Sequence, residues 1–202
     1  MAGLVLAYHE PGLPGGSRLV EELASALGAA AAPLEEAASH CSPGGLVVAL
    51  LPARGGHLES LRSEAGARGC RVTGPLPPGI LGHYAACMLS RASCGGGWIA
   101  YWRAKRLVEE QEEDMLEAAR VASGILGRGV GLAPYEPGRP PRPPAPGACV
   151  VVASLLPGRL PGALRRLGWR VVGESLLSDP EAAREVASWV GSLASDGLEG
   201  HG

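Results

Sequence analysis

The amino-acid sequence predicts an α/β protein of two pseudo-symmetric half-domains, each a small parallel sheet flanked by helices. Apolar runs at residues 4–8 and 46–51 lack the alternation of a half-exposed strand, as is typical of sheets covered on both faces. Strand-like and helix-like segments alternate along the chain, which favours parallel strands joined by right-handed crossovers. The 202 residues are 46% hydrophobic, enough for one sizeable core or two small fused ones.

Matching segments in the same order indicate an internal duplication. Four pairs match: residues 3–9 with 97–102, 18–22 with 106–110, 50–54 with 155–159, and 69–74 with 168–173. We therefore expect an N-terminal half at residues 1–93 and a C-terminal half at 94–202, related by a pseudo-twofold axis. In this alignment Trp102 takes the place of His9.

Each half is expected to read strand, helix, strand, short helix, strand, helix. In the first half these elements are residues 4–8, 17–27, 46–51, 58–65, 71–73 and 80–90. In the second half they are residues 99–101, 103–126, 149–155, 160–166, 170–172 and 180–193. The last helix is marked by Asp179 as N-cap and Pro180 in its first turn. The proline-rich segment 134–147 is expected to be a stiff, solvated connector, with a lid or docking segment as the alternative.

Composition excludes several classes of partner. The net charge of −2 gives no reason to expect nucleic acid or a membrane surface, and no apolar run approaches the roughly 20 residues needed to span a bilayer. The glycine runs do not form a phosphate-binding loop, so no nucleotide is expected. The single Gln and the lack of Asn fit either a heat-adapted protein or a GC-rich genome.

The five cysteines show no CxxC spacing. We expect buried or free thiols in a reducing cytoplasm rather than a cysteine zinc site. Because both halves lie in one chain, a monomer is expected.

Two histidines each follow an apolar strand. His9 comes directly after residues 4–8, and His57 follows residues 46–51 across a short loop. The C-terminal ends of parallel strands share one edge of the sheet, where ligands bind, so the two imidazoles can converge on one metal ion. Imidazole suits Co²⁺, Ni²⁺ and Fe²⁺, and its neutral form accepts a proton near neutral pH. The alternative is that each histidine simply closes a turn.

These residues resemble the small class II, ATP-independent chelatases, in particular the sirohydrochlorin cobaltochelatases. Tyr8-His9-Glu10-Pro11 stands where that family has a G-H-G-S-like motif after its first strand, and Gly55-Gly56-His57-Leu58 matches the loop of its second histidine. Gly173-Glu174-Ser175-Leu176 keeps the acidic residue of a later E-P-L/I-G-like turn. The resemblance implies a cytoplasmic enzyme that inserts Co²⁺ into a sirohydrochlorin-type tetrapyrrole, with His9 and His57 as metal ligands and proton acceptors.

Carboxylates and arginines form a second set of candidates. Glu10 and Glu174 could take a proton or complete the metal shell. The macrocycle carries many carboxylates, for which Arg54, Arg159, Ser17 and the helix start at residues 15–16 are candidate anchors. For each of them an ordinary solvated surface group is the alternative.

The remaining polar and aromatic candidates are expected to be structural. These are His83 near the start of a helix, His40 and His201 on the surface, the solvated acidic run 109–114, and a core cluster of Trp98, Tyr101 and Trp102. Stacking on a tetrapyrrole is the alternative for the aromatic cluster.

Two other functions remain open at this point. A non-catalytic chelatase-like protein would bind a tetrapyrrole or metal and hand it on. A two-lobed enzyme such as uroporphyrinogen III synthase shares the two-half architecture, but it does not explain the paired histidines.

Overall fold

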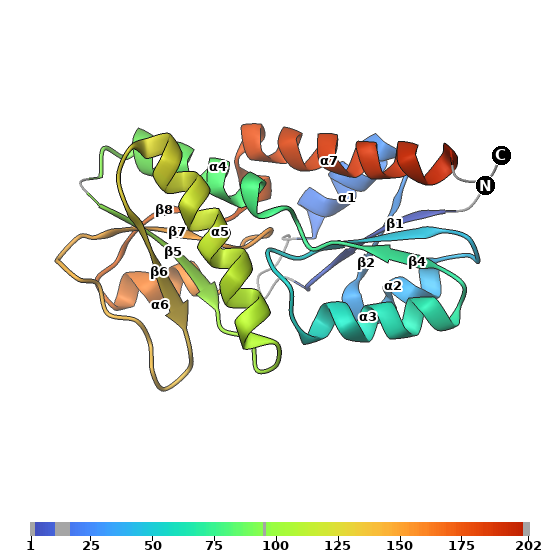
Figure 1. The fold of residues 1–202 in the computed structure, drawn as a ribbon, viewed down its shortest axis with the longest axis horizontal. Coiled ribbons are helices and arrows are strands. Elements are labelled where there is room, and N and C mark those ends of the chain that lie inside the picture. The colour runs from blue at the N-terminus through green and yellow to red at the C-terminus, as the bar shows by residue number, and fades with distance from the viewer. Residues whose placement is uncertain (1–2, 11–16, 95, 200–202) are drawn as a thin grey trace.

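The computed structural model describes residues 3–10, 17–94 and 96–199, and within them the chain forms two four-stranded parallel sheets (Figure 1). The first has the order β2-β1-β3-β4, with strands β1 (Leu4–Tyr8), β2 (Ala30–Pro33), β3 (Leu46–Leu50) and β4 (Arg71–Thr73). The second has the order β6-β5-β7-β8, with strands β5 (Gly97–Trp102), β6 (Val130–Tyr135), β7 (Cys149–Val152) and β8 (Arg170–Gly173). The shared strand order confirms the predicted fold class.

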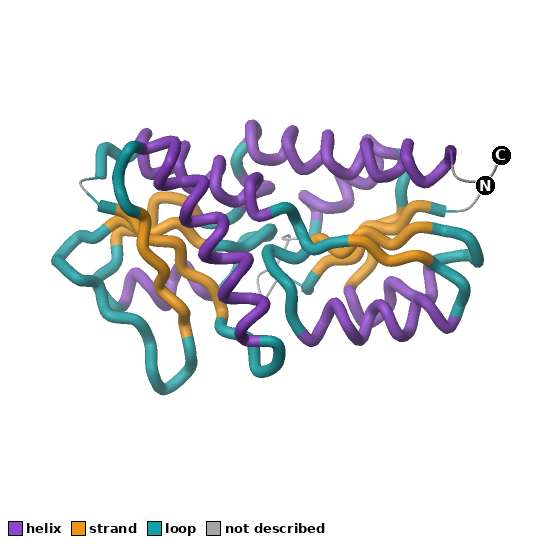
Figure 2. Tube along the Cα trace, viewed as in Figure 1, coloured by secondary structure: helices purple, strands orange, loops and turns teal. Residues whose placement is uncertain are grey.

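Helices cover both faces of each sheet (Figure 2). The helices are α1 (Arg18–Leu27), α2 (Leu34–His40), α3 (Gly56–Ala67), α4 (Pro78–Arg91), α5 (Val108–Leu126), α6 (Leu160–Arg166) and α7 (Pro180–Glu199), with a short 3-10 helix, η1 (Leu176–Ser178). In the first sheet α1 and α7 lie on one face, and α2 and α3 lie on the other. No helix among the described residues is both long and apolar enough to cross a membrane.

The two halves exchange their last helices. Helix α4 follows the first sheet but packs against α5 and strands β7 and β8 of the second, whereas α7 packs against α1 and β3 of the first. Polar contacts join the exchanged helices, with His83 Nδ1 hydrogen-bonded to Glu185 at 2.8 Å and Arg91 ion-paired at 2.7 Å with Asp179, which directly precedes α7. A single apolar cluster contains Leu6 and Val48 of the first sheet and Ile99 and Val151 of the second. The two sheets are therefore held by one continuous core.

The sequence-based expectation of three strands per half was wrong, because each sheet has a further edge strand. The segment Ala30–Pro33 lacks the β-branched and aromatic residues typical of strands, and β6 ends in Pro134 and Tyr135, which had been assigned to the connector. Pro33 lies opposite Tyr8 and Pro134 lies opposite Tyr101. Edge strands tolerate proline because one side of the backbone has no partner.

The start of one other predicted segment also differs from the structure. The long helix begins at Val108 instead of residue 103. Most residues of the proline-rich segment beyond Tyr135 are exposed, as expected, although the carbonyl of Pro141 accepts a 3.0 Å hydrogen bond from the indole of the buried Trp169.

The expectation of unpaired cysteines was also wrong. Cys41 pairs with Cys70, and Cys94 with Cys149, with Cα–Cα distances of 6.4 and 6.1 Å, while Cys87 is free. The partners are distant in sequence, and the starts of neighbouring strands bring them together, which spacing alone does not reveal. Both bonds lie at the N-terminal edges of the sheets.

Candidate metal site at the sheet edge

The structure brings the two strand-end histidines together. Strands β1 and β3 are neighbours, with Tyr8 opposite Leu50, so His9 leaves the sheet beside the chain that leads to His57. His57 is the second residue of α3. Both side chains are exposed, and their ring centroids lie 4.9 Å apart with the ring planes at 80°. The two imidazoles thus face a common space at the C-terminal edge of the first sheet.

This separation suits two ligands of one ion. An ion about 2.1 Å from one nitrogen of each ring lies roughly 3.2 Å from each centroid, so ligand angles of about 90–109° give centroids about 4.5–5.3 Å apart. The observed 4.9 Å falls within that interval. Among the described residues no third His, Cys, Asp or Glu completes a metal-binding group with this pair. Two imidazole ligands would leave coordination positions open for a second partner of such an ion.

A residue of the other half binds the loop that leads into α3, the helix that carries His57. Asp114 of α5 is only 8% exposed, and its Oδ2 accepts a 2.7 Å hydrogen bond from the backbone amide of Arg54. The guanidinium of Arg54 donates to Asp114 Oδ1 at 3.0 Å through Nε and to Glu113 at 3.0 Å through Nη2. These bonds, led by the one to Asp114, hold the pKa of Arg54 above its ordinary value. Arg54 was a candidate substrate anchor, but these carboxylates already occupy it.

Asp114 was missed because it stands within the acidic run 109–114, which was expected to be solvated. In the structure it lies on the buried stripe of α5 with Ala118 and Ala122. The spacing of four residues between these positions is the helical signal that could have identified it.

Most of the other predicted site residues lie apart from the histidine pair. Glu174 follows β8 and forms an ion pair with Arg165. Arg159 is exposed at the N-cap of α6 and takes part in no ion pair among those of the described residues. Glu10 is exposed beside His9. Ser17 is the N-cap of α1, while the candidates at residues 15–16 and His201 lie outside the described residues.

The second half presents an aromatic residue where the first presents His9. Each follows a tyrosine that lies opposite an edge-strand proline, and these tyrosines, Tyr8 and Tyr101, are both buried. Burial, more than any nearby charge, raises the pKa of both phenols. The core assignment was wrong for Trp102, whose side chain is 47% exposed and packs edge-to-face on Tyr135 with centroids 4.6 Å apart.

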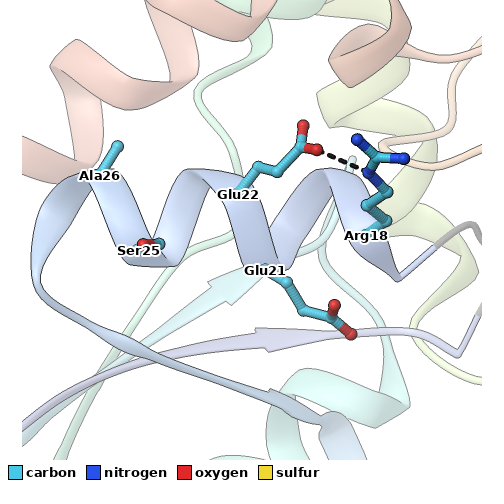
Figure 3. Close-up of a pocket in the computed structure, with 5 residues that line it drawn as sticks. All are labelled: Arg18, Glu21, Glu22, Ser25 and Ala26. Carbon is cyan, nitrogen blue, oxygen red and sulfur yellow. Dashed lines mark hydrogen bonds and ion pairs between the residues drawn. The ribbon is translucent and has the colours of Figure 1, made fainter.

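A surface depression of about 490 Å³ runs along the outer side of α1 (Figure 3). Its lining includes the ion pair of Arg18 with Glu22, 2.7 Å apart, and the carboxylate of Glu21. Neither histidine lines it. We assign no role to this depression.

Comparisons with known proteins support the fold. No family model and no curated protein match the sequence. The solved structure of CbiX, described as the terminal enzyme for siroheme biosynthesis in denitrifying bacteria, is similar with a TM-score of 0.69 and 18% identity, covering 95% of this chain and 99% of CbiX. An allose-bound periplasmic solute-binding protein of an ABC transporter from Actinobacillus succinogenes has a TM-score of 0.43 at 9% identity, covering 98% of this chain and 92% of that one. The chain therefore has the two-sheet fold of CbiX, as the chelatase resemblance predicted.

Proposed function

We propose that the protein inserts a divalent metal ion, preferentially Co²⁺, into a sirohydrochlorin-type tetrapyrrole without ATP. The single observation that carries this proposal is the pair of exposed imidazoles, 4.9 Å apart, at the sheet edge of a chain with the fold of CbiX. Metal insertion requires a group that holds the ion, loss of its waters, and removal of two pyrrole protons. The two imidazoles can serve both in holding the ion and in accepting the protons.

His9 and His57 hold the incoming ion through one nitrogen each. Imidazole is a borderline ligand that binds Co²⁺, Ni²⁺ and Fe²⁺, so the donor set fits a divalent transition metal. The open coordination positions accept the macrocycle nitrogens as water leaves. As the ion moves onto the macrocycle, each freed imidazole accepts one of the two pyrrole protons through the nitrogen that had held the ion.

The remaining parts of the proposal come from the sequence. We propose a cytoplasmic protein that acts as a monomer, since one chain contains both halves. The sequence has no phosphate-binding loop, which supports metal insertion without nucleotide.

The test is replacement of each histidine. His9→Ala and His57→Ala should each abolish the Co²⁺-dependent absorbance change of sirohydrochlorin, because neither imidazole can replace the other as ligand. Circular dichroism should show an unchanged fold, since both side chains are exposed. His40→Ala is the matched control. His40 is also exposed, and its charged neighbour is Glu36, 4.0 Å away in the same helix and not part of the histidine pair. Full activity in both single variants would refute the assignment.

A carrier function is the second candidate. It is favoured by Glu10-Pro11, which replaces the small residues that follow the first histidine in the family that the sequence resembles. A carrier would bind the macrocycle or the ion without inserting the ion into the macrocycle. Absence of metal insertion with Co²⁺, Ni²⁺ and Fe²⁺ in a wild-type protein that binds the macrocycle would establish the carrier in place of the enzyme.

A further inference from the structure

We propose that residues 103–106, the basic loop before α5, bind the carboxylates of the anionic macrocycle, with Arg106 and Lys105 as the contacting side chains. This inference rests on the proposed function, because it names the chemistry by which that site recognises its organic substrate. It gives Arg106 and Lys105 a task for which the sequence had offered Arg54 and Arg159 as candidates.

Arg106 reaches the histidine site from the other half of the molecule. Its Cβ and Cδ lie 3.7 and 3.8 Å from the position that a Cβ on Gly56 would take. Gly56 is the first residue of α3 and directly precedes His57. Figure 1 shows the loop before α5 beside the start of α3. The basic loop therefore lies against the residue that directly precedes His57.

The basic loop is held in one conformation by side chains of α5. Gln111 accepts a 2.7 Å hydrogen bond from the amide of Ala104 and donates a 3.0 Å bond to the carbonyl of Trp102. Arg103 pairs with Glu112 at 3.1 Å, and its amide donates to the carbonyl of Tyr135 at 3.0 Å.

The end of the loop has an unfavourable backbone conformation. Leu107 has φ 55° and ψ 45°, the left-handed region that a residue with a branched side chain seldom adopts. Such a conformation persists only where the surrounding structure imposes it, and it is concentrated at functional sites. The loop is thus anchored before residues 105 and 106 by its bonds to α5, and after them by the imposed conformation of Leu107.

The charges of Lys105 and Arg106 are available to a ligand. Both side chains are exposed, and neither forms an ion pair with any described residue. By contrast, carboxylates already neutralise the neighbouring Arg54 and Arg103. A guanidinium binds a carboxylate through two parallel hydrogen bonds, and an ammonium adds a point charge. The exposed indole of Trp102, at the start of the same loop, offers an apolar surface beside these charges.

Direct binding of a metal-free macrocycle tests this inference without metal insertion. The probe is uroporphyrin I, which carries carboxylates on every pyrrole, and binding is followed by fluorescence. We expect Arg106→Gln and Lys105→Ala each to weaken binding by about 3–10-fold, and the double variant by about 10–100-fold. Added salt should weaken wild-type binding more than that of the double variant. Arg106→Lys keeps the charge and should restore part of the affinity.

The control is Arg68→Ala, at the opposite end of α3 from His57, which should bind the probe as wild type does. Co²⁺ binding by the metal-free protein should be the same in all these variants. Wild-type affinity for uroporphyrin in the double variant would overturn the inference, as would a wild-type protein that does not bind the probe. If the double variant binds weakly and wild type never inserts metal, the inference holds and the proposed enzyme fails. If wild type inserts metal and the double variant has the wild-type KM for the macrocycle, the proposed enzyme stands and the inference about the basic loop fails.

Discussion

Replacing Asp114 by Ala should destabilise the whole protein, because this carboxylate joins the two halves. Asp114 is nearly buried in α5, and it accepts hydrogen bonds from both the backbone amide and the guanidinium of Arg54 in the loop before α3. Removal of the carboxylate leaves the amide without its acceptor and the guanidinium with Glu113 alone.

The magnitude follows from the burial of each partner. Breaking a fully buried ion pair by removing one partner costs about 3–5 kcal/mol. Here the Arg54 side chain is 37% exposed and keeps its contact with Glu113, so water and this carboxylate recover part of the loss. The backbone amide adds about 1–3 kcal/mol as an unsatisfied donor. We expect a net loss of about 2–4 kcal/mol, or roughly 4–16 °C in Tm for a chain of this size.

Urea unfolding followed by circular dichroism measures the change. Glu117→Ala is the matched control, because Glu117 lies on the same helix and forms an exposed pair with Arg120 at 3.1 Å. Exposed pairs contribute about 0–1 kcal/mol, so this variant should unfold close to wild type. If Asp114→Ala also stays within about 0.5 kcal/mol of wild type, the bond between the halves is not a stabilising contact and the reasoning fails.

Three other predictions concern stability. Reduction of the disulfides, which close loops of 29 and 55 residues, should cost about 4 kcal/mol each in unfolding free energy, while alkylation and mass analysis of the unreduced protein should find one free thiol. Burial raises the pKa of Asp179, but hydrogen bonds from the amides of α7 and the pair with Arg91 outweigh it and lower the pKa. Asp179→Ala should therefore lower the unfolding free energy by about 1–2 kcal/mol at neutral pH. When urea unfolding is repeated at lower pH, this difference should disappear as wild-type Asp179 is protonated, below its ordinary pKa of about 3.9. Gly82→Ala should destabilise by about 1–3 kcal/mol in urea, because its Cβ would lie 2.6 Å from Val121, whereas Gly124→Ala meets nothing within 4 Å and should be neutral or stabilising.

The histidine pair was predictable because its placement depends on topology more than on packing. Apolar runs without alternation indicated a parallel sheet, and parallel strands bring residues that follow them to one edge. The structure places His9 and His57 together for this reason, although 48 positions separate them in the printed sequence. Their roles in metal binding remain predictions.

The elements that were missed depend on tertiary partners. An alanine-rich segment becomes β2 only because β1 offers it a free edge. Arg54 and Arg159 occupy the same place in the sequence repeat, yet only Arg54 meets a buried carboxylate. Sequence periodicity does not encode such pairings, whereas the helical spacing of Asp114 with the buried alanines of α5 was readable in principle.

The difference between these two arginines shows how the duplicated halves came to play separate parts. In the repeat that aligns residues 18–22 with 106–110, the position equivalent to Asp114 of α5 is Ala26 of α1. Arg159 thus lacks the acidic partner that fixes Arg54, and α6 begins directly after it, without the Gly-Gly-His segment of the first half. The two halves share one strand order, but their side chains contribute differently. The first half supplies two imidazoles, and the second supplies both the carboxylate that binds the loop before α3 and the basic loop beside the start of that helix. Because Asp114 lies in α5 and the basic loop directly precedes it, movement of α5 would displace the loop before α3 and the proposed carboxylate-binding loop together.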